Sequence, residues 1–183
     1  TEFLKSNGLP ERTTTQQALS DLESIHGTDV CPDTKRFKSG ITSKAQTSLQ
    51  KYLRVPEKET YLPDSHRLVN HTEEAAKVFS YLLQEAPRNK RIMGEARAEY
   101  GIKKRNVTVL DPEQPSLTIT TIPDDFVHYS EPRVMTVREC ARLQTFPDWF
   151  EFKGPYTTGG PRRVKQTPRY TQVGNAVPPL VAE

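Results

Sequence analysis

The sequence predicts an α+β fold: a small, loop-rich domain with short, largely antiparallel strands and several helices. Hydrophobic residues make up only 34% of the 183 residues and the mean hydropathy is -0.71, so a large apolar core is not expected. Fifteen prolines against nine glycines imply many loops and short elements. Apolar residues recur at helical spacing in several segments, whereas alternation with a period of two is confined to one stretch.

Two short helices are predicted in the N-terminal third. Thr14 and Gln17 have the spacing of a capping box, and Gly27 is expected to end the helix that they begin. Its apolar positions are Ala18, Leu19, Leu22 and Ile25. A second helix is predicted over residues 42–54, where Ala45, Leu49, Tyr52 and Leu53 share one side.

A third, clearer helix is predicted to begin after Thr72, which suits the N-cap position. Glu73 and Glu74 would occupy its first turn, where the helix dipole favours acidic side chains. Its apolar face consists of Ala76, Phe79, Leu82 and Leu83. Pro87 follows the end of this helix.

The stretch from Pro87 to Asn106 is strongly basic. Against Glu95 and Glu99 it carries seven positive side chains: Arg88, Lys90, Arg91, Arg97, Lys103, Lys104 and Arg105. A basic run is often only a solvated surface. In a protein that handles nucleic acid it favours phosphate binding, because each neutralised phosphate releases counterions.

Residues 107–127 carry the strand pattern. Val107, Val109, Leu117 and Ile119 alternate with threonines, which is typical of strands. Pro112 and Pro115 interrupt the alternation, so two short strands are expected rather than one.

The segment that follows Arg133 begins with a further helix. Thr136 and Glu139 have capping-box spacing, and Pro147 is expected to end the helix. Val137, Ala141 and Leu143 are predicted to face a core, with Arg138, Arg142 and Gln144 on other faces.

A loose basic loop follows, with cations at Lys153, Arg162, Arg163, Lys165 and Arg169. Phosphate contact and a plain surface insertion both suit this composition. Gly174 and Asn175 then predict a tight turn, and Pro178 or Pro179 suits the first turn of a last helix.

The overall composition narrows the class of protein. A formal charge of +3 and a pI near 8.8 are compatible with nucleic-acid binding but are only mildly basic. Two cysteines without metal-ligand spacing predict a reducing, cytoplasmic setting, and His66 and His71 lack a third ligand nearby, so no metal site is expected. The sequence has no signal-peptide pattern and no apolar run long enough for a membrane span, so no membrane partner is expected.

The blocks TVRECARLQTFPDWFEFKG and YTQVGNAVPP closely resemble the last two sequence motifs of DNA cytosine-5 methyltransferases. In that family a helix of the form RE-x-ARLQ-x-FPD precedes a GNAVPP turn near the end of the chain. The resemblance is close over roughly the last 50 residues. The preceding residues match the family in position and general character, with far fewer fixed residues. It implies methyl transfer from S-adenosylmethionine to C5 of a cytosine that is flipped out of double-stranded DNA.

The catalytic elements of that family have no counterpart in this sequence. We find no Gly-rich cofactor loop, Pro-Cys-Gln nucleophile, Glu-Asn-Val block or paired-arginine strand. Cys31 is followed by Pro32 and Cys140 lies inside the helix motif, so neither has the context of the nucleophile and no catalytic residue is assigned. The resemblance therefore implies a piece of a larger enzyme, inactive alone, with S-adenosylmethionine bound mainly by the absent catalytic domain.

The resemblance also implies site residues. Arg133 and Arg138 flank the cap of the helix motif, where the family places groups that hold phosphates around the flipped nucleotide; pairing of Arg138 with a carboxylate is the structural alternative, and Arg142 is expected to pack structurally. Further DNA contacts are expected from Thr118 and Ile119, in a stretch that resembles an element at the base of the recognition loops, and from the basic run. The latter are Arg91, Lys103, Lys104 and Arg105. Asn175 and Ala176 would lie beside the methionine end of the cofactor.

Two regions are expected: residues 1–132 as a target-recognition region, and residues 133–183 as a helix motif, basic loop and GNAVPP segment that would return to the catalytic domain. Three functions stay open. The chain is the DNA-recognition fragment of a single-chain methyltransferase, the small subunit of a split enzyme, or a non-catalytic DNA-binding module. All three predict double-stranded DNA as a partner, and the first two also require the missing catalytic domain or subunit.

Overall fold

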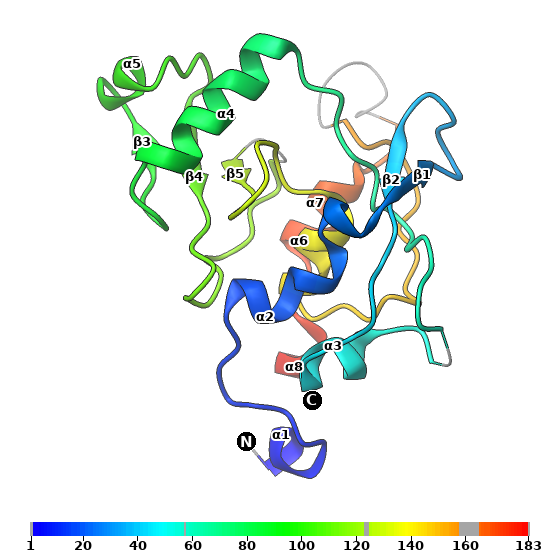
Figure 1. The fold of residues 1–183 in the computed structure, drawn as a ribbon. Helices are drawn as coiled ribbons and strands as arrows, with labels where there is room; N and C mark the ends of the chain where they lie inside the picture. Colours follow the sequence, from blue (N-terminus) through cyan, green and yellow to red (C-terminus); the bar gives the residue numbers. More distant parts are fainter. Residues whose placement is uncertain (1, 57, 123–124, 158–164, 183) are drawn as a thin grey trace.

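A computed structural model describes residues 2–56, 58–122, 125–157 and 165–182 (Figure 1). The fold is mixed α+β, as predicted. The helices are α1 (Glu2–Ser6), α2 (Thr15–Leu19), α3 (Ser48–Leu53), α4 (Glu73–Glu85), α5 (Ala96–Glu99), α6 (Val137–Leu143), α7 (Arg169–Asn175) and α8 (Pro179–Ala182), with short 3-10 turns η1 (Ser20–Leu22) and η2 (Ser24–His26). The strands are β1 (Thr28–Val30), β2 (Lys38–Gly40), β3 (Ile92–Met93), β4 (Asn106–Val109) and β5 (Phe126–Val127).

The strands form two small sheets. β1 and β2 pair antiparallel as a hairpin, and β4 lies between antiparallel β3 and parallel β5. The prediction of a strand at β4 is confirmed, whereas that of a strand around Leu117 and Ile119 is wrong. Pro112 and Pro115 remove two backbone donors just before these residues, and the backbone there pairs with none of the described strands. Ile119 is nevertheless buried, because its side chain packs in the main apolar core.

Local capping explains where α2, α3, α4 and α6 begin. The capping boxes predicted at Thr14 and Thr136 are present, and Thr72 caps α4 as predicted. α3 is shorter than the predicted helix over residues 42–54, because Thr47 caps it at Ser48. Ile25 lies in η2 with 82% of its surface exposed, so the predicted apolar face does not extend to it.

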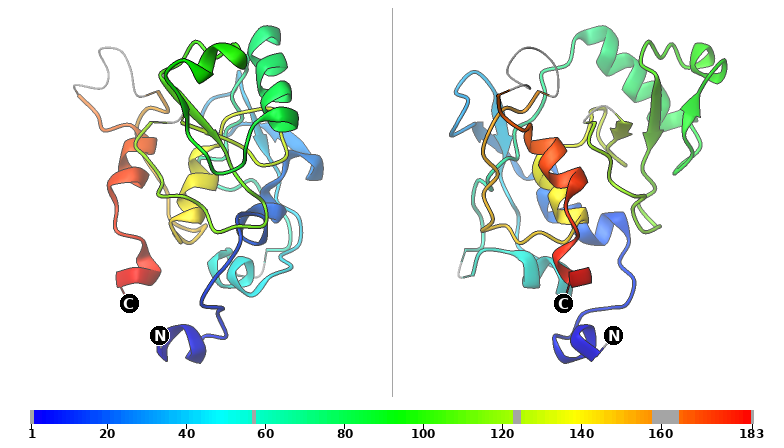
Figure 2. Two further views of the ribbon diagram at one scale, coloured as in Figure 1. Left: turned by 90° about the vertical axis from the view of Figure 1, so that its left-hand side faces the viewer. Right: turned by 180° about the vertical axis from the view of Figure 1, so that it is seen from behind.

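α6 lies at the centre of the fold, between α2 and α7 (Figure 2). Its predicted inward residues Val137 and Ala141 are fully buried, but so are Arg138 and Arg142, which the sequence placed on other faces. The main apolar cluster draws residues from α2, α3, α6 and α7, and therefore from both regions expected in the sequence. A second cluster lies between α4 and the sheet of β3, β4 and β5.

The end of α6 differs from the prediction. The helix ends at Leu143 rather than at Pro147, and Thr145 takes a left-handed conformation with φ of 61°. The amide of Phe146 then donates to the carbonyl of Ala141 at 2.9 Å, which is the pattern of a Schellman motif. This turn directs the Phe146 ring into the core.

The C-terminal helices also differ. Gly174 and Asn175 do not form the predicted tight turn, because they are the last residues of α7. Tyr170 and Val173 of α7 are buried, and the Tyr170 hydroxyl donates to the carbonyl of Met135 at 2.7 Å. The prediction that a proline opens the last helix is confirmed, since α8 begins at Pro179.

Gly174→Ala is expected to lower the free energy of unfolding by about 1–3 kcal/mol, because a Cβ there would lie 2.6 Å from the backbone of Thr120. Helix propensity alone would favour alanine, so the sign of the change reports the close approach. Urea unfolding measures it, with Thr171→Ala in the same helix as the control. A Gly174→Ala variant as stable as the parent would contradict this packing.

Candidate nucleic-acid interface

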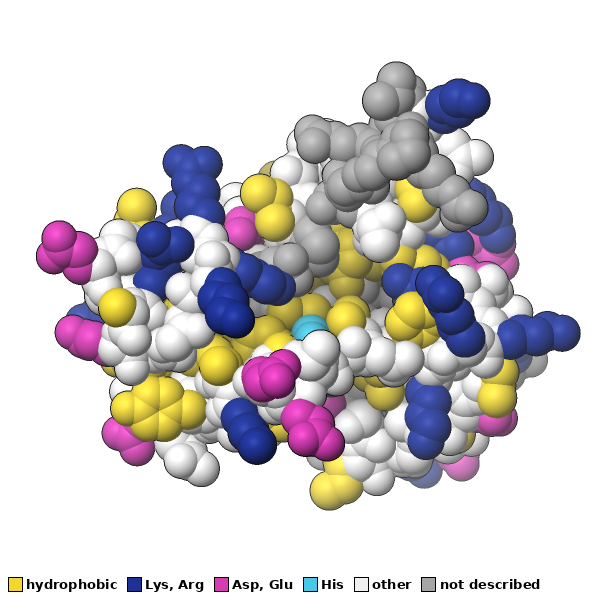
Figure 3. All heavy atoms as spheres, turned by 90° about the horizontal axis from the view of Figure 1, so that it is seen from above, with side chains coloured by type: hydrophobic (Ala, Val, Ile, Leu, Met, Phe, Trp, Pro, Cys, Tyr) yellow, Lys and Arg dark blue, Asp and Glu magenta, His cyan; other side chains and the backbone are white. Residues whose placement is uncertain are grey.

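Positive side chains lie on both sides of a hollow in the face shown in Figure 3. One group covers the part of the molecule with α4, α5 and β3, and the other covers the β1–β2 hairpin. Hydrophobic side chains line part of the hollow, and acidic side chains lie at one edge. A groove with cations on both sides suits a polyanion such as duplex DNA.

The first group lies on the segment from Pro87 to Val109, here called the β3–β4 arm. Antiparallel pairing of Ile92 with Val107 and of Met93 with Asn106 puts the three cations before β4 beside the end of β3, and puts Arg91 beside the second half of β4. The four cations of the arm that the sequence selected as DNA-binding are all exposed: Arg91, Lys103, Lys104 and Arg105.

Two arginines fix the shape of the β3–β4 arm. Arg97 donates to the carbonyls of Gly94 at 3.0 Å and Lys104 at 2.7 Å, which holds the connection between β3 and β4. Arg88 donates to carbonyls at the base of the arm, those of Leu83, Leu110 and Tyr129. These two basic residues therefore serve the backbone, while the other cations of the arm face solvent.

The second group lies on the β1–β2 hairpin, where Lys35, Arg36 and Lys38 are exposed. This hairpin was not selected in the sequence analysis. The signal that could have found it is the occurrence of three cations within four positions. The segment after His66 runs beside β2, with the amide of Leu68 donating to the carbonyl of Lys38 at 2.9 Å.

His66 ties the hairpin to α6. Its Nε2 donates to the carbonyl of Leu22 at 2.8 Å and its Nδ1 accepts from the Thr136 hydroxyl at 2.9 Å. Gly40 makes room for the ring, since a Cβ at that position would lie 2.5 Å from Nε2. Complete burial lowers the pKa of His66, so the ring is neutral and structural at pH 7.

Arg133, which the sequence assigned to DNA phosphates, is 7% exposed and engaged by protein carboxylates. It forms a two-pronged pair with Glu139, at 2.9 and 2.6 Å, and its Nε donates to Glu131 at 2.6 Å. Despite the cost of burial, Glu139 raises the pKa of Arg133 and Arg133 lowers the pKa of Glu139. Phosphate contact by Arg133 stays a prediction.

Arg138, the other assigned motif arginine, is fully buried. Its guanidinium donates to the carbonyls of Asp64, Pro147 and Phe150 at 2.8, 3.1 and 2.5 Å, and approaches the Asp64 carboxylate at 3.4 Å. Burial lowers the pKa of Arg138. In this structure Arg138 organises the loop after α6, and its contact with phosphate is likewise still a prediction.

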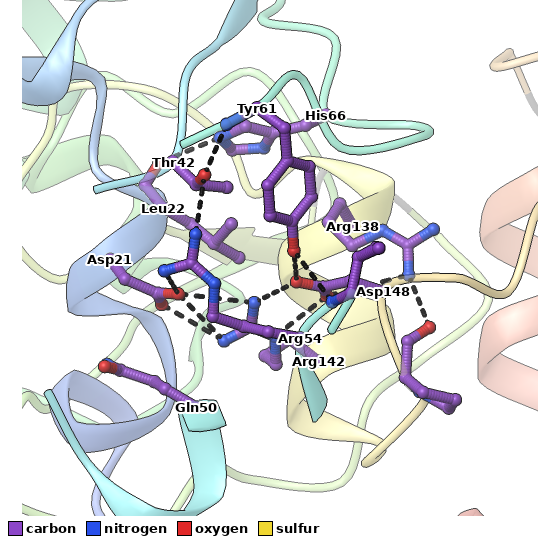
Figure 4. Close-up of polar contacts among 12 residues, drawn as sticks. Asp21, Leu22, Thr42, Gln50, Arg54, Tyr61, His66, Arg138, Arg142 and Asp148 are labelled. Carbon is purple, nitrogen blue, oxygen red and sulfur yellow. Dashed lines mark hydrogen bonds and ion pairs between the residues drawn. The ribbon is translucent and has the colours of Figure 1, made fainter. Parts of the chain in front are cut away.

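Arg142 is the centre of a buried ion network (Figure 4). It donates to Asp21 at 3.1 Å and to both carboxylate oxygens of Asp148 at 3.1 and 2.5 Å. Arg54 also pairs with Asp21, and the Tyr61 hydroxyl donates to Asp148. The expected structural role of Arg142 agrees with this network, which joins α6 to the segment after α2 and the end of α3.

The remaining candidates lie apart from the hollow or within the core. Thr118 is exposed and Ile119 is buried, and both line a cavity of about 460 Å³ between α8 and the N-terminal segment. Asn175 is exposed and Ala176 half-buried at the end of α7, next to Val177, which is 67% exposed.

In the basic loop, Arg162 and Arg163 lie outside the described residues. Lys153 pairs with Glu151, and Arg169 is buried and pairs with Asp33 at 2.6 Å.

The two cysteines and His128 have structural environments. Cys31 and Cys140 are buried thiols, and burial raises the pKa of Cys140. Burial lowers the pKa of His128 to about 4, and its Nδ1 accepts from the amides of Ser130 and Glu131. Within the described ranges, no group of three or more His, Cys, Asp and Glu side chains could hold a metal, and no helix is long and apolar enough to cross a membrane.

The chain belongs to the C-5 cytosine-specific DNA methylase family, whose sequence pattern matches residues 8–183. The type II methyltransferase M.AquIB of Picosynechococcus sp. is 54% identical over 78 residues, which are 40% of this chain and 55% of that protein. M.DdeI of Desulfomicrobium norvegicum, also a type II methyltransferase, is 28% identical over 177 residues, which are 94% of this chain and 41% of that protein.

A solved structure extends the comparison to the fold. A crystal structure described as a DNA modification methyltransferase encoded within a prophage (E. coli) has a TM-score of 0.57 at 23% identity, covering 96% of this chain and 45% of that chain. At this identity the likeness concerns the fold alone. The matches to these three proteins span between 41% and 55% of their lengths.

Proposed function

We propose that this chain is the DNA-recognition part of a DNA cytosine-5 methyltransferase. The observation that carries the proposal is the hollow with exposed cations of the β3–β4 arm on one side and of the hairpin on the other (Figure 3). Exposed cations on both sides would neutralise backbone phosphates and orient a duplex. The names of the relatives favour a place in a restriction–modification system.

The reaction itself is proposed to take place on another part of the enzyme. Bound S-adenosylmethionine would supply the methyl group, and the target cytosine must leave the stacked duplex to be reached. Asn175 and Ala176 lie at an open end of α7, which suits the predicted approach of this segment to the cofactor. Residues 1–132 would then read DNA, and residues 133–183 would connect this part to the catalytic domain.

A second candidate is the small subunit of a two-chain methyltransferase. The observation in its favour is the length of M.AquIB. The 78 matched residues make up 55% of that protein, which means that M.AquIB is shorter than this chain. The reading frame distinguishes the two. A start codon close to Thr1 is expected for a separate subunit, whereas a frame that continues upstream through catalytic motifs is expected for a single chain.

The combined substitution Arg91→Gln, Lys103→Gln and Arg105→Gln is expected to weaken binding of mixed-sequence duplex DNA about a hundredfold or more at low salt. Each lost phosphate contact should also reduce the slope of log K against log salt by about 1. Fluorescence anisotropy at several salt concentrations measures both quantities.

The matched control removes three exposed cations elsewhere: Lys5→Gln, Arg12→Gln and Lys51→Gln. The same change in net charge should then leave the slope close to that of the parent. Equal losses of affinity in the two triple variants would mean that the β3–β4 arm contributes only through the net charge of the protein. A folded parent chain that binds no duplex at low salt would contradict the proposed function of the isolated chain.

A further inference from the structure

Arg67 is held between two aromatic rings from distant parts of the chain. Its guanidinium carbon lies 4.1 Å from the centre of the Phe37 ring and 3.7 Å from the centre of the Tyr156 ring. Its backbone is fixed by a bridge to Ser39 in β2. Stacking on two faces fixes the plane of the guanidinium and leaves its edge to make hydrogen bonds.

The Arg67 guanidinium lacks the partners that neighbouring arginines have. Within the described part of the chain no hydrogen bond or ion pair engages it, and its Nε is buried without an acceptor. Arg169, whose guanidinium carbon lies 4.2 Å from the same Tyr156 ring, pairs instead with Asp33 and donates to Ser65. Burial lowers the pKa of Arg67, which indicates a cation whose lost hydration is not replaced.

The surroundings of Arg67 favour an anion rather than a neutral ligand. Arg36 also contacts Phe37, with its guanidinium carbon 5.2 Å from the centre of that ring. Lys35 and Lys38 are exposed on the same hairpin. The nearest acid on the hairpin loop, Asp33, is occupied by Arg169, the Tyr156 hydroxyl and Cys31. A planar, oriented guanidinium amid uncompensated cations suits a phosphate group.

We propose that Arg67, together with Arg36, binds a backbone phosphate of duplex DNA. This site rests on the proposed function, and it adds an oriented phosphate contact beside the β1–β2 hairpin, which lies across the molecule from the β3–β4 arm (Figure 1). The aromatic stack positions the contact before DNA arrives. Arg67 thereby fixes the register of the duplex without reading its sequence.

Arg67→Met tests the proposal, because it keeps a long apolar stem between the rings and removes the charge. Affinity for duplex DNA is expected to fall about tenfold, equally for unrelated sequences, and the salt slope to fall by about 1. The melting temperature is expected to stay level or rise, because an unpaired, half-buried charge is removed. Arg12→Met, an exposed cation between α1 and α2, should leave affinity, slope and melting temperature unchanged.

Opposite directions of stability and binding distinguish a phosphate contact from a structural stack. A lower melting temperature with an unchanged salt slope would assign Arg67 to structure and overturn the proposal. If the β3–β4 arm variant loses binding while Arg67→Met binds like the parent, this site fails and the proposed function stands. A parent chain that binds no duplex overturns both.

A second measurement observes the side chain directly. The Arg67 Nε–H resonance, identified by its loss in Arg67→Met, is expected to shift when duplex DNA is added. A shift with inorganic phosphate but none with duplex would replace the DNA site by a site for free phosphate and overturn the proposal. A shift with duplex that salt suppresses in parallel with binding supports it.

Discussion

Arg142→Met is expected to lower the free energy of unfolding by about 3–5 kcal/mol at pH 7, because it strands two buried carboxylates. Asp21 and Asp148 are 1% and 3% exposed, and each accepts hydrogen bonds from Arg142. Arg54 would remain 3.4 Å from Asp21, and Tyr61 and Arg138, the latter at 3.9 Å, would remain beside Asp148. Both acids would nevertheless lose their closest guanidinium contacts. Urea unfolding followed by circular dichroism measures the loss, and Arg12→Met should change the stability by less than about 0.5 kcal/mol.

The pH dependence of the Arg142→Met variant identifies the cause. Burial already raises the pKa of Asp21, with Arg142 acting in the opposite direction. Without Arg142 the folded-state pKa of Asp21 should rise further above its unfolded value. A raised carboxyl pKa contributes stability that is present below the unfolded pKa and is lost as the pH rises through the folded pKa. The defect should therefore shrink as the pH is lowered from 7 toward 5.

A compensating variant completes the test. Arg142→Met combined with Asp21→Asn and Asp148→Asn removes all three charges together, and it should recover part of the lost stability. If the triple variant is less stable than Arg142→Met alone, then stranded charge is not the cause. The lost hydrogen bonds of the network would then explain the defect.

A contact could be predicted from the sequence when the two interacting residues are close together along the chain. Capping boxes at Thr14 and Thr136 were predictable because the cap and its partner are three residues apart. The burial of Arg138 and Arg142 was not, because their carboxylates at Asp64 and Asp21 lie 74 and 121 positions away. A local helical wheel places such residues on a surface, and only the fold shows that no surface is there.

The same reasoning explains the candidate interface. The cations of the β3–β4 arm were predicted because they belong to one basic run of the sequence, and pairing of β3 with β4 joins the two halves of that run in one sheet. Arg67 was not predicted, because its environment comes from Phe37 and Tyr156, on either side of it in the chain and far from it. The β1–β2 hairpin was missed as a pair of strands because it lacks apolar alternation: all of β1 is exposed.

Glu139→Gln is expected to lower the free energy of unfolding by about 3–5 kcal/mol at pH 7, because Arg133 then keeps Glu131 and the Val134 carbonyl as partners but loses its two-pronged carboxylate pair. Arg133 lowers the pKa of Glu139, so this carboxylate contributes stability that is present above the unfolded value of 4.5 and is lost as the pH falls toward the folded pKa. The unfolding free energies of the parent and Glu139→Gln should therefore converge as the pH drops below about 4.5. Parallel curves between pH 7 and 3 would contradict the ion pair.

The Arg133–Glu139 pair also determines how any loss of DNA binding at this motif must be interpreted. Arg133→Met removes the same pair from the other side, so a double-mutant cycle with Glu139→Gln should give a stability defect well below the sum of the two single defects. If Arg133 acts only through the fold, the folded fraction of Arg133→Met keeps the salt slope of the parent. If it also meets a phosphate, the slope falls by about 1 even where the protein is fully folded. The slope therefore separates the two roles because, unlike the apparent affinity, it does not depend on how much of the protein is folded.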